Sequence, residues 1–209
     1  MTFTRRSVIP AVLIAGAAVA FFLREGPPRA APPEGGAAII AFGDSLVEGR
    51  GTTAGGDFVS VLSKRLRVRI VNAGRSGDTT RSALERLDRD VLSRNPRIVL
   101  VLLGGNDALR RVPARDTFGN LGTIVERIRA RGAAVVLIGI SPGVFSDPYA
   151  DEYEQLARRT AAGLVPDILD GIFGRADLMA DTIHPNDRGH QLIADRVEPV
   201  LRELLAAGR

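Results

Sequence analysis

Apolar runs and amphipathic segments alternate along this chain from residue 37 onward. The most continuous run, Ile98–Leu103, contains no polar residue, which is typical of a strand buried on both faces of a sheet. The segments between the runs carry apolar residues at helical spacing. Strands that alternate with helices predict an α/β protein, in which helices cover both faces of a central, mostly parallel sheet in a three-layer α/β/α sandwich.

The boundaries of these elements follow from where each pattern starts and stops. The expected strands are Ile39–Gly43, Val68–Ala73, Ile98–Leu103, Ala133–Ile140 and a short edge strand at Val165–Leu169. The expected helices are Gly56–Leu66, Thr79–Arg94 with Asp78 as N-cap, Asp116–Arg131 with Asp116 as cap, Tyr149–Ala162 and Asn186–Ala206. Parallel sheets bind ligands beyond the carboxyl ends of their strands. We therefore expect the glycine-bounded ends at Gly43, Gly74 and Gly104 to face a binding site.

Composition narrows the class of protein. The chain has 209 residues, 45% hydrophobic and 25% charged, which suits one globular domain with an appendage. The formal net charge is +4, and acidic residues are interspersed with the arginines, so there is no basic stripe and we expect no nucleic-acid partner. The absence of cysteine excludes disulfides, thiolate catalysis and cysteine-ligated metals.

The N-terminal region predicts export. An arginine pair, Arg5-Arg6, precedes the apolar stretch Ser7–Leu23, so residues 1–25 form either a signal peptide, loosely of the twin-arginine type, or an uncleaved membrane anchor. Residues 26–36 are rich in proline and glycine and predict a linker to a domain at 37–209. We expect a periplasmic or extracytoplasmic domain, or one held on the outer face of the cytoplasmic membrane through residues 7–23.

A serine, a histidine and an aspartate fit the chemistry of acyl transfer. Ser45 follows the first predicted strand, where a partly exposed hydroxyl suits a nucleophile. Imidazole is the usual base for such a serine, and the chain has two histidines, His184 and His190. Asp181 lies three residues before His184, a spacing that lets its carboxylate reach Nδ1 and orient the ring. His190 falls inside a predicted helix, and we interpret it as a solvated or structural residue.

Acyl transfer also needs hydrogen-bond donors directed at the oxyanion of the tetrahedral intermediate. The candidate donors are the backbone N–H groups of Ser45 and Gly74 and the side-chain amide of Asn106. Each of these residues also has a simpler interpretation, as a turn or cap residue.

Four short motifs together resemble the SGNH hydrolases, also called the GDSL esterase family. They are GDSL at Gly43–Leu46, the glycine block Asn72-Ala73-Gly74, GGND at Gly104–Asp107 and DxxHP at Asp181–Pro185. The order and spacing of the four blocks are those of the family, and the resemblance extends over residues 39–200. Within the family, the chain is most similar to the bacterial thioesterase I, arylesterase and lysophospholipase group.

The resemblance implies a flavodoxin-like fold and an esterase that needs neither a metal nor another cofactor. It implies Ser45 as nucleophile, His184 as general base and then acid, Asp181 as the residue that orients it, and an oxyanion hole from Ser45, Gly74 and Asn106. The implied substrate is a small-molecule ester or a lipid-like acyl compound. The candidate substrate-binding residues are Asp44, Asp107, Ala108 and Leu109, although the motif carboxylates also read as acceptors that hold loops.

Two alternatives remain open on the sequence. One is an O-acetyl esterase that acts on envelope polysaccharide with the same triad. The other is a catalytically silent binding module on a membrane anchor. A nucleotide-binding role is disfavoured, because neither GxGxxG after a strand nor GxxxxGK[ST] is present.

Overall fold

The structure, a computed structural model, describes residues 38–141 and 149–207. Its centre is one sheet of five strands in the order β2-β1-β3-β4-β5, in which every neighbouring pair is parallel. The strands are β1 (Ala38–Gly43), β2 (Ile70–Gly74), β3 (Pro96–Leu102), β4 (Ala134–Ile138) and β5 (Gly163–Val165). This confirms the predicted fold class, with a sheet that is wholly parallel in the described part of the chain.

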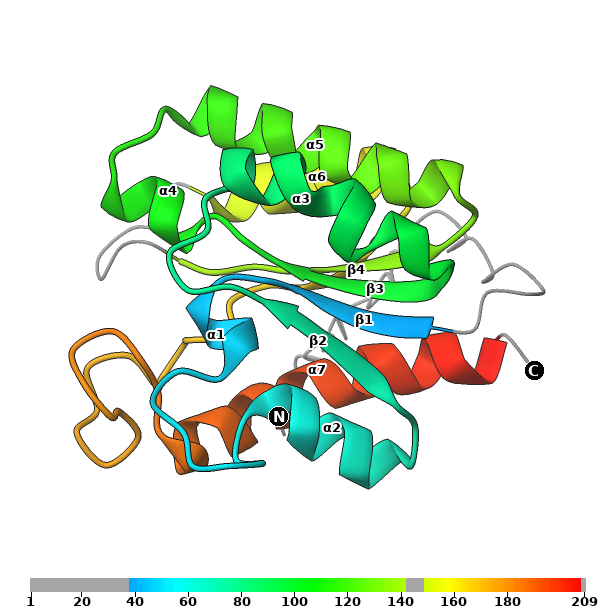
Figure 1. Ribbon diagram of the computed structural model, residues 1–209. Coiled ribbons are helices and arrows are strands. Elements are labelled where there is room, and N and C mark those ends of the chain that lie inside the picture. Colours follow the sequence, from blue (N-terminus) through cyan, green and yellow to red (C-terminus); the bar gives the residue numbers. More distant parts are fainter. Residues whose placement is uncertain (1–37, 142–148, 208–209) are drawn as a thin grey trace, which may run out of the picture.

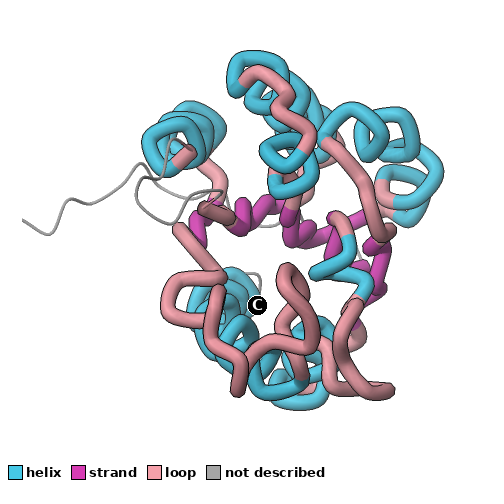
Figure 2. Tube along the Cα trace, turned by 90° about the vertical axis from the view of Figure 1, so that its left-hand side faces the viewer, coloured by secondary structure: helices cyan, strands magenta, loops and turns pink. Residues whose placement is uncertain are grey.

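Helices cover both faces of the sheet (Figure 1). One layer contains α2 (Phe58–Leu66) and α7 (Asp187–Ala207), and the other contains α3 (Thr80–Asp90), α5 (Ala114–Ala130) and α6 (Ala150–Thr160). Figure 2 looks onto the carboxyl edge of the strands and shows the sheet between the two layers, with loops gathered at this edge.

Two short helices stand at the same edge. Helix α1 (Ser45–Glu48) directly follows β1, and α4 (Gly105–Leu109) follows β3. A 3₁₀ turn, η1 (Leu92–Arg94), comes after α3. Sequence patterns did not predict α1 or α4, because helices of four and five residues are too short to show a helical period.

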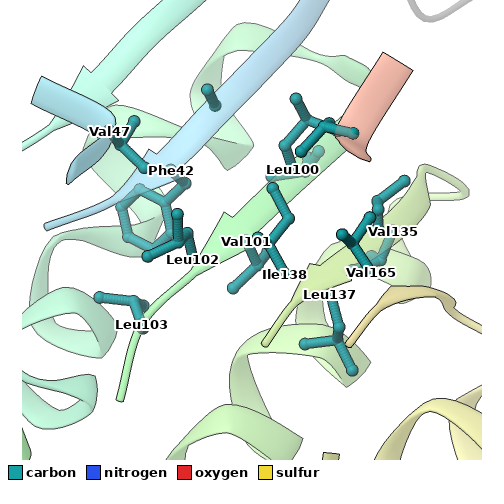
Figure 3. Packing of buried hydrophobic residues seen from close by; sticks show 14 of the residues in the cluster. Phe42, Val47, Leu100, Val101, Leu102, Leu103, Val135, Leu137, Ile138 and Val165 are labelled. Atoms are coloured by element: carbon teal, nitrogen blue, oxygen red, sulfur yellow. The ribbon is translucent and has the colours of Figure 1, made fainter. Parts of the chain in front are cut away.

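Strand β3 forms the middle of the hydrophobic core. Every residue from Ile98 to Leu103 is buried, as expected for a central strand covered on both faces. Phe42 at the end of β1 lies beside Leu102, and Val135, Leu137 and Val165 continue the core across β4 and β5 (Figure 3). This packing fixes the end of β1, which the candidate nucleophile follows two residues later at the start of α1.

Several predicted boundaries are wrong for identifiable reasons. Thr79, not Asp78, is the N-cap of α3, because Thr79 and Ser82 form a reciprocal capping box. Helix α5 begins at Ala114 after Pro113, so Asp116 is in its first turn and is not its cap. Strand β5 ends at Val165, because Pro166 has no N–H to continue the ladder.

The signal or anchor predicted for residues 1–25 and the linker at 26–36 lie outside the described residues. Of the helices within 38–141 and 149–207, none has the length and apolar character needed to cross a bilayer.

Candidate active site

The strand order brings three predicted motifs to one point of the sheet. β1 lies between β2 and β3, and the connections from β1 and β3 leave in opposite directions along the sheet. The carboxyl end of β1 is therefore a topological switch point, where open α/β sheets bind ligands. Ser45 follows β1 and Asn106 follows β3 at this point, and the turn 75–78 follows β2.

Ser45, His184 and Asp181 form a continuous hydrogen-bonded chain. His184 Nε2 is 3.1 Å from Ser45 Oγ, and His184 Nδ1 is 2.8 Å from Asp181 Oδ2. Ser45 is the first residue of α1, whose N-cap Asp44 accepts the N–H of Leu46 at 3.0 Å. Distant parts of the sequence, 139 residues apart, thus meet at hydrogen-bonding distance.

The loop before α7 holds the imidazole in place. Met179 and Pro185 form an isolated antiparallel bridge, and the carbonyl of His184 accepts the N–H of Ala180 at 2.8 Å. Asn186 accepts the N–H of Gly189 at 3.1 Å, which satisfies one of the free donors at the start of α7. His184 therefore sits on a short, hydrogen-bonded loop that enters a helix, as its proline neighbour predicts.

Asp181 is fixed on both of its oxygens. Its Oδ1 accepts the backbone N–H groups of Ile183 and His184, both at 2.8 Å. The hydrogen bond with the His184 ring, followed by these two N–H groups, lowers the pKa of Asp181 to about 2. Asp181 is therefore ionised near neutral pH and accepts the Nδ1–H of His184. This hydrogen bond leaves Nε2 of the ring free to accept the proton of Ser45.

Asn106, the predicted side-chain donor to the oxyanion, lines the same pocket as Ser45. Its amide Nδ2 donates to the carbonyl of Asp78 at 3.0 Å and contacts Asp44 Oδ2 at 3.3 Å. The amide is thereby anchored to the turn after β2 and lies in the wall of the pocket that contains Ser45.

Gly74 does not fit the role of oxyanion donor. Its N–H already donates to Asn72 Oδ1 at 2.9 Å, and the Asn72 amide in turn donates to the carbonyl of Val47 at 2.6 Å. A Cβ at position 74 would lie 2.1 Å from the Glu48 nitrogen. Glycine is required here because β2 passes against the backbone of α1, and this close approach explains the glycine without an oxyanion.

Of the candidate substrate-binding residues, Asp107 does not line the pocket that contains Ser45. Its side chain is 1% exposed, and its carboxylate accepts both the N–H and the hydroxyl of Thr80, at 2.9 and 2.6 Å. Asp107 therefore holds α4 against the start of α3, and the prediction that it contacts substrate is wrong. Asp44, Ala108 and Leu109 do line the pocket.

Asp44 is a buried carboxylate next to the nucleophile. Burial, with smaller contributions from the charges of Asp78 and Asp107, raises its pKa to about 7, although the N–H of Leu46 acts in the opposite direction. Such a shift is common beside catalytic groups. Near neutral pH the Asp44 side chain therefore exists in both protonation states.

A pocket of about 350 Å³ opens beside Ser45 and His184. Its walls come from α4, from residues 140–141 after β4 and from the segment 167–173. Three of the large apolar side chains that are exposed in the described chain surround it: Leu109 (67%), Phe173 (49%) and Ile183 (41%). The wall also contains the carboxylates Asp167 and Asp170, and none of its described residues is a lysine or an arginine.

The sequence did not single out Phe173, Ile183, Asp167 or Asp170 as pocket residues. Ile183 lies inside the DxxHP motif, next to His184, and that position was an available signal. Phe173 and Asp170 lie in a segment without regular secondary structure, where no sequence pattern distinguishes a pocket residue from any other loop residue.

His190 is structural and fully buried, so the solvated alternative is wrong. Its Nδ1 accepts the N–H of Phe58 at 3.2 Å, and the ring stacks on Phe58 with centroids 6.1 Å apart. Burial lowers the pKa of His190 to about 4, against smaller opposing effects of Asp57 and Asp187. Its Nε2 has no hydrogen-bond partner in the described part of the chain.

The depressed pKa of His190 predicts an acid-sensitive contribution to stability. Between pH 6.5 and about 4, the unfolded state binds a proton at this site that the native state does not, so stability is lost as the pH falls. His190→Asn retains an acceptor for Phe58 N–H and removes the titration. Urea unfolding should show wild type losing about 3 kcal/mol more than this variant between pH 7 and pH 4.

The comparison with the variant isolates His190 from Asp44. Asp44 changes stability with pH in the opposite direction to His190, because its pKa is raised. The contribution of Asp44 to stability is lost as the pH rises from 3.8 to about 7. That contribution is common to both proteins and cancels in the difference. Parallel pH dependences of wild type and His190→Asn would refute the prediction.

Comparison with known proteins connects this geometry to a family. The sequence profile of the GDSL-like Lipase/Acylhydrolase family matches residues 41–192. The chain is 34% identical over 178 residues to Esterase TesA of Pseudomonas aeruginosa, covering 80% of this chain and 89% of that protein. It is 30% identical over 175 residues to Thioesterase 1/protease 1/lysophospholipase L1 of Escherichia coli K12, covering 80% and 84%.

Solved structures agree with the sequence relatives. A crystal structure of TesA superimposes with a TM-score of 0.75 at 32% identity, covering 80% of this chain and 99% of that chain. The two curated relatives are named an esterase and a thioesterase/protease/lysophospholipase, and these names favour neither an O-acetyl esterase for polysaccharide nor a silent binding module.

Proposed function

Because this chain belongs to the GDSL-like lipase/acylhydrolase family and is a carboxylic ester hydrolase, we propose that it acts through an acyl-enzyme on Ser45. The observation that carries this proposal is the continuous chain from Ser45 Oγ through the His184 ring to the Asp181 carboxylate. His184 removes the Ser45 proton as the hydroxyl attacks the ester carbonyl, then donates it to the leaving alcohol. Water activated by the same imidazole completes hydrolysis.

The oxyanion is held by groups around Ser45. We assign the N–H of Ser45, for which the described residues provide no acceptor, and the Asn106 amide, which exchanges its long 3.3 Å contact with Asp44 for the oxyanion. The turn anchored to Asn106 offers a third donor in place of Gly74. The N–H of Gly77 has no acceptor within the described residues, and its φ of +81° favours glycine.

The substrate is a small-molecule ester or a lipid, and we propose an uncharged acyl chain of medium length. The exposed apolar side chains around the 350 Å³ pocket provide a surface that an acyl chain covers on binding. Asp167 and Asp170 in the wall would repel an acyl chain with a terminal carboxylate. Esters and thioesters with such chains are both compatible with this pocket.

Truncating the pocket rim tests the acyl site. In Phe173→Ala, kcat/KM for p-nitrophenyl octanoate should fall by about 5- to 30-fold, because an apolar contact with the chain is lost. The rate with p-nitrophenyl acetate should change by less than about twofold, because an acetyl group is too short to reach the rim. Leu192→Ala is the matched control, since Leu192 is an exposed apolar residue on α7 that does not line the pocket.

The acyl-site assignment fails if Phe173→Ala lowers the rates with acetate and octanoate equally. It also fails if Leu192→Ala shows the same preference for short chains.

We further propose that the enzyme is exported and that residues 7–23 associate it with the membrane when they are retained. The support is the arginine pair followed by an apolar stretch and a proline- and glycine-rich linker. Recovery of the full chain only from the cytoplasm would contradict this localisation.

A further inference from the structure

Arg86 is a buried arginine of α3 whose charge is surrounded by acceptors. Its side chain is only 5% exposed. Nε donates to Asp78 Oδ2 at 2.5 Å, Nη1 to Asp90 Oδ2 at 3.0 Å, and Nη2 to the carbonyl of Gly43 at 3.0 Å. The guanidinium also lies 4.4 Å from the centroid of the Phe42 ring, within the range of a cation–π contact. Every nitrogen of the guanidinium therefore has a partner.

Two of these partners belong to the two halves of the active site. Gly43 is the last residue of β1, two positions before Ser45. Asp78 is in the turn after β2, and its backbone carbonyl accepts the Asn106 amide at 3.0 Å. A single planar group thus joins the support of the nucleophile to the support of an oxyanion donor.

The buried setting makes this connection rigid. Asp78 is 4% exposed, so the ion pair with Arg86 is shielded from water. A guanidinium presents its donors in a fixed fork, so the relative positions of its partners are defined by its geometry. A lysine ammonium in the same place is a single point of charge, which cannot reach Asp78, Asp90 and the Gly43 carbonyl together.

We propose that Arg86 is a positioning residue, which sets the separation between the Ser45 hydroxyl and the Asn106 amide by bracing β1 against the turn 75–78. Arg86 does not line the acyl pocket and so has no contact with bound substrate there. This inference rests on the proposed function, because it assumes that Ser45 and Asn106 act on the same carbonyl.

Replacing Arg86 should therefore lower kcat and leave KM nearly unchanged. In Arg86→Met, kcat for p-nitrophenyl hexanoate should fall about 10- to 100-fold, as expected when an oxyanion donor is misplaced, while KM stays within about threefold. Arg86→Lys should lie between Met and wild type. The affinity for an alkyl trifluoromethyl ketone, which forms a tetrahedral adduct with a catalytic serine, should fall in proportion to kcat/KM.

Two further variants separate positioning from stability. Leu87→Ala removes a buried side chain from the same helix and keeps the groups that form the Arg86 bonds to Asp78 and Gly43. It should lower the melting temperature with kcat unchanged. Asp78→Asn/Arg86→Met replaces the buried ion pair with neutral groups, which restores much of the stability lost in Arg86→Met. If Arg86 acts by positioning, kcat of this double variant stays low.

The outcomes distinguish this inference from the proposed function. Recovery of kcat together with stability in the double variant, or a fall of kcat in Leu87→Ala equal to that in Arg86→Met, would overturn the positioning role. A rise of KM with kcat unchanged in Arg86→Met would overturn it too. Labelling of wild-type Ser45 by a fluorophosphonate tests the nucleophile separately, so its failure would instead refute the proposed function.

Discussion

Ser45→Ala is expected to lower kcat for ester hydrolysis by about four to six orders of magnitude, to a rate that only substrate binding and oxyanion stabilisation support. The hydroxyl is the atom that becomes acylated, and no other side chain is within reach of His184 Nε2 in the hydrogen-bond pattern of the described residues. KM should change little, because removing one hydroxyl leaves the apolar walls of the pocket intact. Steady-state rates with p-nitrophenyl butyrate measure the effect.

The fold should tolerate this change. Ser45 is partly exposed and its side chain makes one hydrogen bond, to His184, so the melting temperature should stay within a few degrees of wild type. Ser93→Ala is the matched control, because the Ser93 hydroxyl donates to the Arg89 carbonyl on the exposed surface of the chain. A fluorophosphonate should label wild type and Ser93→Ala and should not label Ser45→Ala. Hydrolysis by Ser45→Ala at more than a few per cent of the wild-type rate would contradict the acyl-enzyme.

The layers of the fold were predictable because they depend on local patterns. The six consecutive apolar residues Ile98–Leu103 predict a strand buried on both faces, because such a run has no polar side for solvent. The observed strand β3 occupies Pro96–Leu102. Helix α7 was likewise placed to within one residue by its apolar period. Short helices such as α1 cannot be predicted in this way, because they are stabilised by caps and tertiary contacts and have no apolar period in the sequence.

The site was predictable in part. The spacing of Asp181 and His184 is local, so the contact between them follows from sequence, and the motifs place Ser45 opposite them. Gly74 shows where this reasoning stops. A glycine at the end of a strand indicates a special backbone requirement. Whether the N–H of Gly74 is free depends on the Asn72 side chain, whose amide is held by a hydrogen bond to the Val47 carbonyl.

Arg86 illustrates the other kind of gap. Nothing in the sequence distinguishes it from the other arginines of the charged segment 80–90. It is buried because its acceptors, the Asp78 carboxylate and the Gly43 carbonyl, are brought to it by the packing of α3 on the sheet. Contacts of this kind depend on tertiary structure and have no periodic signature.

Asp181→Asn should lower kcat by about two to three orders of magnitude. The asparagine oxygen can still accept the N–H groups of Ile183 and His184, so its amide NH₂ then faces Nδ1 of the imidazole. Nδ1 must then be the acceptor, and the ring proton moves to Nε2, where it points at Ser45 Oγ and blocks proton removal. In a buried triad this exchange costs about four orders of magnitude. The Asp181 side chain is 50% exposed, so water competes for the ring and the loss is smaller.

Asp177→Asn provides the matched control for this change. Asp177 is a carboxylate of the same loop with similar exposure, and it pairs with Arg175 and Arg188 and makes no bond with His184. Its replacement should leave kcat within about twofold of wild type, which shows that the effect at position 181 does not come from general loss of negative charge. A kcat for Asp181→Asn within threefold of wild type would mean that His184 is oriented by its loop alone. The hydrogen bonds around the His184 backbone would then be sufficient, and the carboxylate would have no part in the choice of tautomer.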